Sequence, residues 1–203
     1  MSKENRNLSK EEFKNLVFQT KKKEKENKIR TDRIWVNKVI IIAFIVSFCM
    51  SYASNEVIPK INILLGIIIT LLFVILGILF DIVGVAVTSA DEAVFHSMNS
   101  RKVKGANVAV IFKKNASKVS SFCCDVIGDI CGIVSGAAAT TISIVVATKF
   151  NFDLMLTGLI TAGIISSLTI GGKAMGKSFA INKSNIILYE FSKFISIFYK
   201  KNN

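Results

Sequence analysis

The chain has 203 residues, of which 51% are hydrophobic, and it carries a formal net charge of +12. The apolar residues come in long runs and there is a single proline, which excludes an ordinary soluble domain and indicates a polytopic helical membrane protein, all-α in class. Because the lysines and arginines lie beside the apolar runs, we expect them to meet anionic membrane lipid, and we expect no nucleic acid as a partner.

Residues 1–33 are rich in lysine and glutamate, which predicts a charged, partly helical cytoplasmic tail. No short basic segment precedes a cleavable apolar core, so we expect no signal peptide. The transmembrane domain is expected at 34–173, followed by a cytoplasmic juxtamembrane amphipathic helix at 174–203. Four runs in that domain are long enough to cross a hydrocarbon core of about 30 Å. They are residues 34–54, 61–88, 119–148 and 154–172.

The segment 97–118, between the second and third spans, carries six Lys/Arg and no acidic residue, and it should lie at the membrane surface. Residues 1–33 contain eleven Lys/Arg and the chain from Lys173 onward contains six, whereas the turns 55–60 and 149–153 hold one each. The positive-inside rule therefore predicts a multi-pass protein of the plasma membrane with both termini in the cytoplasm.

The third span carries the residues that point to a function. Asp125 and Asp129 are four residues apart, so they share one face of a helix. A charged side chain at membrane depth costs about 2.5–3.5 kcal/mol on insertion scales, which makes both carboxylates candidates for a functional site. The neighbouring stripe of Gly128, Gly132 and Gly136 predicts close packing against another helix.

Other reactive residues give weaker signals. The four cysteines all lie inside apolar runs and form no CxxC pair, so we expect neither a disulfide nor a zinc site. The lone His96 is expected at the membrane interface. The chain has no nucleophile elbow, no HExxH and no second histidine, and we expect that it is not an enzyme.

Three segments resemble, in sequence and in order, the membrane domain of the CNNM/CorB/CorC magnesium and cobalt transport proteins. Residues 89–93 (SADEA) are similar to that family's S-A-S-E-T-A, and a basic stretch with Lys104-Gly105-Ala106 follows them as it does there. Residues 122–129 are similar to F-L-S-T-x-L-I-G-N, and residues 172–178 stand in the place of G-E-x-x-P-K-x. The resemblance covers about residues 62–200 and implies magnesium transport by a homodimer.

Carried over by position, the family's cation site would involve Ser89 and Asp129, with Glu92 at its acidic position. We expect Asp125 as a further ligand, since Mg²⁺ prefers oxygen ligands in octahedral geometry. Asp81, Asp91 and Lys173 would tune the charge of the site or gate it. The expected function is therefore transport of a divalent cation, with Mg²⁺ as the bound or transported ion.

The chain differs from the family at three positions and in extent. Asp129 stands in place of asparagine, Lys173 in place of glutamate and Gly176 in place of proline. Residues 34–54 would be an additional span, and no segment corresponds to the family's CBS-domain pair, so regulation would be absent or come from a separate subunit.

The alternative function is a degenerate, non-transporting membrane subunit or scaffold, in which the acids pair with Lys173, Lys177 or Arg101 and only fix helix packing. The two functions differ in what they require of Lys173. Pairing with Asp129 or Asp125 favours the subunit, whereas an ammonium turned to the cytoplasmic surface leaves room for an ion.

Overall fold

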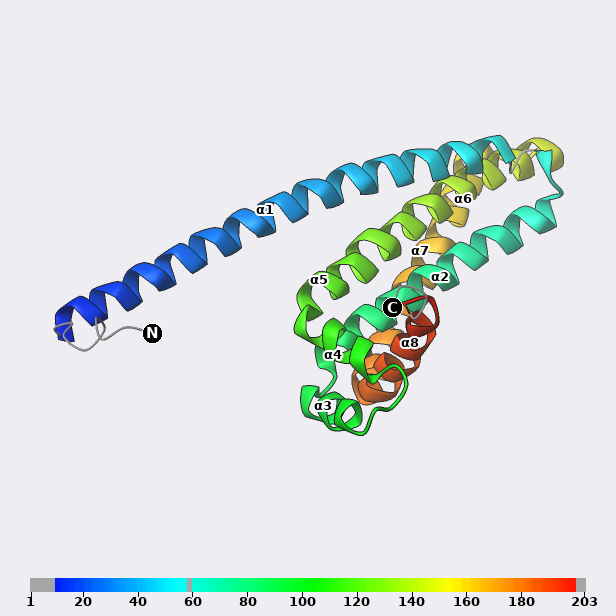
Figure 1. Ribbon diagram of the computed structural model, residues 1–203. Helices are drawn as coiled ribbons and strands as arrows, with labels where there is room; N and C mark the ends of the chain where they lie inside the picture. The colour runs from blue at the N-terminus through cyan, green and yellow to red at the C-terminus, as the bar shows by residue number, and fades with distance from the viewer. Residues whose placement is uncertain (1–9, 58–59, 200–203) are drawn as a thin grey trace. The chain divides into compact units, whose positions relative to one another are not determined.

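A computed structural model describes residues 10–57 and 60–199, and within these ranges the chain is helical with no β-strand (Figure 1). Four helices are long and apolar enough to cross a membrane, at 34–53, 63–89, 116–150 and 154–182. The predicted all-α, polytopic membrane fold is thereby confirmed. The chain divides into two units, residues 1–42 and 43–203, which are described separately below.

The first long helix, α1, runs without interruption from Lys10 to Val57. The sequence predicts a charged tail before residue 34 and a separate span after it, but both parts belong to this one helix. Residues 10–57 contain neither glycine nor proline, and the charged part consists largely of Lys and Glu, which are good helix formers. Residues 1–9 of the predicted tail lie outside the described part of the chain.

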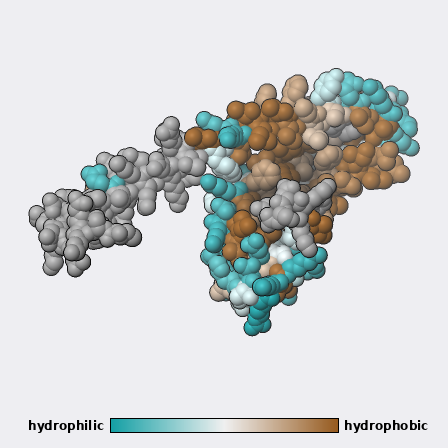
Figure 2. Space-filling model, viewed as in Figure 1, coloured by the Kyte–Doolittle hydropathy of each residue, from teal (hydrophilic) through white to brown (hydrophobic). Residues whose placement is uncertain are grey.

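The second unit contains a bundle of three long helices, which we call the bundle: α2 (Ile63–Ser89), the third span and α7 (Leu154–Asn182). The third span is continuous but consists of three parts, α5 (Ala116–Ser121), a π-helical segment η3 (Phe122–Gly128) and α6 (Asp129–Phe150). All three long helices contact one another. In Figure 2, apolar residues gather over the middle of the bundle and hydrophilic residues at its ends.

One face of α2 provides the centre of the bundle. Its buried residues recur every three or four positions and are mostly small, which lets neighbouring helices approach closely. A Cβ atom added at Gly77 would lie 3.1 Å from the Cβ of Cys131 and 3.3 Å from the carbonyl oxygen of Gly128. One added at Gly84 would collide with the Sγ atom of Cys124. The buried members of this face are Gly66, Thr70, Val74, Gly77, Asp81 and Gly84.

Three shorter helices pack around the end of α2 and form a unit that we call the cap: α3 (Glu92–Ser100), α4 (Ala106–Lys114) and α8 (Ser184–Tyr199). The Lys113 ammonium of α4 donates hydrogen bonds to the carbonyl oxygens of Val87 (3.2 Å) and Thr88 (2.7 Å), which satisfies acceptors at the end of α2. The apolar core of the cap consists of Val87, Ala90, Phe95, Ala109, Val110 and Leu188.

The ends of the elements differ from the sequence prediction at the C-terminal side. The fourth span is predicted to end at residue 172, but α7 continues to Asn182, and the amphipathic helix begins only at Ser184. Lys173 and Gly176 therefore lie within a continuous helix. Position 176 is a glycine, which keeps its backbone N–H, so no missing backbone donor interrupts α7 there.

Candidate functional site

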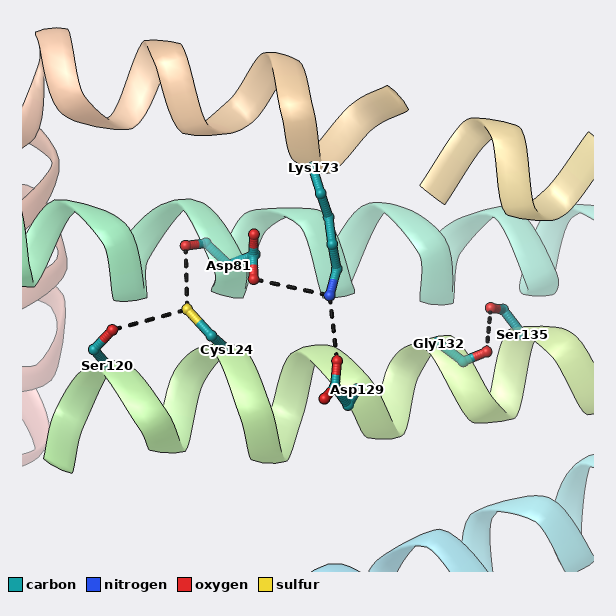
Figure 3. Close-up of polar contacts among 7 residues, drawn as sticks. All are labelled: Asp81, Ser120, Cys124, Asp129, Gly132, Ser135 and Lys173. Carbon is teal, nitrogen blue, oxygen red and sulfur yellow. Dashed lines mark hydrogen bonds and ion pairs between the residues drawn. The ribbon is translucent and has the colours of Figure 1, made fainter. Parts of the chain in front are cut away.

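Three charged side chains from the three long helices of the bundle meet at one place, where Lys173 of α7 lies between an acid of α2 and an acid of α6 (Figure 3). Its Nζ atom is 3.4 Å from Oδ1 of Asp129 and 3.8 Å from Oδ1 of Asp81. Both distances exceed the 2.7–2.9 Å that is usual for a charge-assisted hydrogen bond. The ammonium is thus shared between two carboxylates and bound tightly to neither. We call these three side chains the ion bridge.

The two acids of the ion bridge have very different surroundings. The Asp81 side chain is 11% exposed and that of Asp129 is 64% exposed, while Lys173 is 25% exposed. Two carboxylates and one ammonium add up to a formal charge of −1 if all three are ionised. Since Asp81 is buried among helices, it depends on Lys173 for compensation far more than Asp129 does.

The π-helical segment η3 lies directly beside the ion bridge and orients its neighbours. From η3, the thiol of Cys124 contacts the backbone carbonyl oxygen of Asp81 at 3.6 Å and the hydroxyl of Ser120 at 4.0 Å (Figure 3). π-helical turns inside α-helices occur frequently at functional sites. Here the segment ends at Gly128, and Asp129 is the first residue of the following helix.

The residues proposed as metal ligands occupy two separate regions. Ser89 ends α2, eight residues beyond Asp81, which corresponds to about 12 Å along a helix. Glu92 belongs to α3, where its carboxylate lies 3.2 Å from Nε2 of His96. Asp129, by contrast, belongs to the ion bridge. Ser89 and Glu92 are therefore not brought together with Asp129 in this structure.

Asp91 lies at the start of the cap and stabilises the beginning of α3. Its side chain accepts a hydrogen bond from the backbone N–H of Ala93 at 3.0 Å, which makes it the N-cap of α3. Its own backbone N–H donates to Oδ1 of Asn185 in α8 at 2.8 Å. These contacts connect the turn after α2 to α8.

The outward face of the third span carries Asp125 and Asp129, as their shared helical face predicts; both are exposed. The predicted glycine stripe beside them is used only in part. Gly128 is buried, and a Cβ atom added there would lie 3.6 Å from the carbonyl oxygen of Gly77. A Cβ atom added at Gly132 or Gly136 would meet no described atom within 4 Å, so these two glycines do not serve packing within the described part of the chain.

The bundle also does not contain a preformed metal site among its described side chains. Among the side chains that the structure describes, no three of His, Cys, Asp or Glu lie close enough together to hold a metal ion. Asp81 and Asp129 supply two carboxylates to one region, and Lys173 occupies the space between them. A cation could bind these two acids only if the ammonium moved away, since like charges repel.

Some contacts of the site have no clear signal in the sequence. The thiol contact of Cys124 depends on η3, and no residue type in that segment specifies a π-helical turn. The carbonyl contacts of Lys113 depend on how α4 packs across the end of α2. For Gly77 and Gly84, the seven-residue spacing on α2 is a usable signal of close helix packing.

Comparison of the chain with models of known protein families, with curated proteins and with solved structures gives no match.

Proposed function

We propose that this chain is a non-transporting membrane subunit, in which Lys173 takes the place of a cation between Asp81 and Asp129. The observation that carries the proposal is the ion bridge itself, since the Lys173 ammonium is paired with Asp129 at 3.4 Å and is not turned away from the bundle. An ammonium supplies only hydrogen-bond donors, whereas Mg²⁺ requires oxygen ligands at about 2.0–2.1 Å. With Lys173 in place, the two acids fix helix packing and do not bind metal.

Flux measurements on the purified chain test this proposal. Liposomes that enclose a Mg²⁺-sensitive dye and carry the wild-type chain should give the same signal as protein-free liposomes. Lys173→Glu replaces the ammonium with a third carboxylate beside Asp81 and Asp129, and calorimetry should then detect Mg²⁺ binding that the wild type lacks. Lys177→Glu is the matched control, since Lys177 is exposed one helical turn further along α7 and should give no such gain.

The second candidate is transport of Mg²⁺ or another divalent cation, which the loose geometry of the ion bridge favours. Contacts of 3.4 and 3.8 Å hold the ammonium weakly, and the exposed Asp129 and Asp125 side chains leave net negative charge at the same face. Mg²⁺ flux through wild-type liposomes that is lost in Asp129→Asn would refute the subunit and support transport. Flux that persists in Asp129→Asn would exclude Asp129 from the transport mechanism.

We also infer the membrane, the orientation and the partners of the subunit. The distribution of Lys and Arg supports a multi-pass protein of the plasma membrane with both termini and the cap on the cytoplasmic side. The open face of the third span, with Gly132 and Gly136, supports association with another transmembrane helix, and we propose a homodimer. A separate regulatory subunit would bind at the cytoplasmic side.

A further inference from the structure

The apolar part of α1 has no tightly packed neighbour among the residues that the structure describes. From Ile34 to Ala53 no residue is buried, and the side chains of Ile41, Ile42 and Ile45 are more than half exposed. A membrane helix with such an open surface is covered either by lipid or by another helix. The charges on α1 and on the third span favour a helix.

The outer face of the third span is unsuited to lipid alone. The Asp129 side chain is 64% exposed there, and a charge that faces hydrocarbon is costly. Lys173 does not neutralise the ion bridge, because two carboxylates and one ammonium leave a formal charge of −1. One further cation at this face would complete the charge balance.

Lys38 of α1 is a cation at the matching depth. It is exposed, it lies one turn inside the apolar part of α1, and no acidic residue lies within five positions of it. It precedes the end of α1 at Val57 by 19 residues, whereas Asp129 precedes the end of α6 at Phe150 by 21 residues. At 1.5 Å per residue these lengths are about 28 and 31 Å. Since the first and third spans of a multi-pass chain cross in the same direction, the two charges lie at nearly the same depth.

The residues that follow the two charges are complementary in size. From Asp129, two open glycines follow after three and seven residues, on the same helical face. From Lys38, the exposed Ile41 and Ile45 follow at the same spacing. When parallel helices lie side by side with the charges level, the two large side chains meet the two positions that have none. Close approach at small residues is how membrane helices associate.

We propose that α1 of a second copy packs along the outer face of the third span, with its Lys38 beside Asp129 and its isoleucines against the two glycines. The pairing rests on the homodimer proposed above and specifies its two helices. The chain's own α1 does not cover this face, because Ile45 and Gly136 belong to one unit and no atom of Ile45 lies within 4 Å of a Cβ atom added at Gly136. A two-fold axis gives two such contacts in each dimer.

Disulfide cross-linking between copies tests the pairing. Cys49 follows Lys38 by eleven residues and Thr140 follows Asp129 by eleven, and both are exposed. Full-length copies that carry Thr140→Cys and Cys49→Ser are mixed in liposomes with differently tagged wild-type copies and oxidised with copper phenanthroline. The two tags should become linked through Cys49. Ile164→Cys with Cys49→Ser is the matched control, since Ile164 is exposed on α7 as far from the outer end of its helix as Thr140 is, and it should not be linked.

The outcomes separate this pairing from the homodimer itself. Copies with Thr140→Cys and Cys49→Ser that link to one another would show that the third spans meet directly, which overturns the pairing and leaves the homodimer. A disulfide formed only within single Thr140→Cys copies that keep Cys49 would likewise overturn it. Ile45→Cys mixed with Gly136→Cys, both with Cys49→Ser, gives a second pair, and failure of both pairs overturns the pairing. Energy transfer between labelled wild-type copies, which measures dimerisation alone, should be present; its absence would overturn the homodimer as well.

The role of Lys38 is measured by the same energy transfer as the protein is diluted with lipid. Lys38→Met should weaken the dimer about fivefold, the usual scale of one polar contact between membrane helices. Lys38→Arg keeps the charge and should dimerise as wild type does. Lys149→Met removes an exposed lysine at the outer end of α6 and should have no effect. Equal dimerisation of Lys38→Met and wild type would overturn the contact between Lys38 and Asp129.

Discussion

Both faces of the third span carry glycines, but the two faces use them differently. On the inner face, a Cβ atom added at Gly84 of α2 would collide with the Sγ atom of Cys124, and one added at Gly77 would lie only 3.3 Å from the carbonyl oxygen of Gly128. On the outer face, Asp125 and Asp129 are exposed, and Gly132 and Gly136 meet no described atom within 4 Å. A glycine stripe in a membrane span therefore shows where another helix can approach closely, but it does not show which helix does so.

Removing the ammonium from the ion bridge should have the largest effect on stability. Lys173→Met keeps the length of the side chain but leaves Asp81, which is 11% exposed, without its counter-charge. Breaking a buried pair by removing one partner costs about 3–5 kcal/mol, and we expect about 3 kcal/mol here because the contacts are long. Equilibrium unfolding in mixed micelles of dodecyl maltoside and SDS, followed by circular dichroism, measures the loss.

A matched substitution controls for the general effect of removing a lysine from α7. Lys177→Met, one turn away and exposed, should change the free energy of unfolding by less than about 0.5 kcal/mol. Equal losses in the two variants would show that Asp81 does not need Lys173.

Filling the contact between α2 and η3 should have the next largest effect. In Gly84→Ala the new methyl group would overlap the Sγ atom of Cys124 and lie 3.1 Å from the carbonyl oxygen of Ser120. Overpacking of a close contact costs about 1–3 kcal/mol, and we expect about 2 kcal/mol in the same unfolding assay. Gly84→Ala combined with Cys124→Ala should recover part of the loss, and the absence of any recovery would contradict the assigned contact.

The sequence predicts the number and approximate position of the spans well, because a run of about 20 apolar residues matches the thickness of a bilayer and is rare in soluble proteins. It predicts less well which side of a span meets protein. In water an apolar face must be buried, but in a membrane lipid-facing and protein-facing sides are both apolar, so periodicity alone cannot separate them. This is why the sequence reveals the stripe at Gly128, Gly132 and Gly136 but not how much of it is used in packing.

For the candidate site, the sequence identifies the participants better than their arrangement. Asp129 stands out because charge at membrane depth is costly, and its pairing with Lys173 is one of the two outcomes that the sequence leaves open. The sequence assigns Asp81 only to charge tuning or gating, yet it is the more buried acid of the ion bridge. Its depth depends on the rotation of α2, which hydropathy does not encode. The roles of Ser89, Glu92 and Asp125 as ligands stay predictions.

Neutralising the exposed acid of the ion bridge should have a smaller effect than neutralising the buried one. Asp129→Asn removes the charge of a side chain that is 64% exposed, and pairs of this kind contribute less than about 1 kcal/mol. Asp81→Asn should cost more, since Asp81 is the acid that burial makes dependent on Lys173. The same unfolding assay ranks the two variants, and a larger loss for Asp129→Asn would contradict the assigned asymmetry.

The smallest effect is expected at Gly132, and its sign distinguishes the two faces of the third span. An added methyl group meets no described atom within 4 Å, so Gly132→Ala should increase the free energy of unfolding by about 0.5 kcal/mol, as replacing glycine in a helix usually does. Gly132→Leu should not lower the free energy of unfolding of the single chain either, because nothing described lies within 4 Å of its Cβ atom, but it should weaken any association that uses the outer face. Chemical cross-linking in liposomes measures that association, and a Gly132→Leu chain that cross-links as well as wild type would place the contact between copies elsewhere.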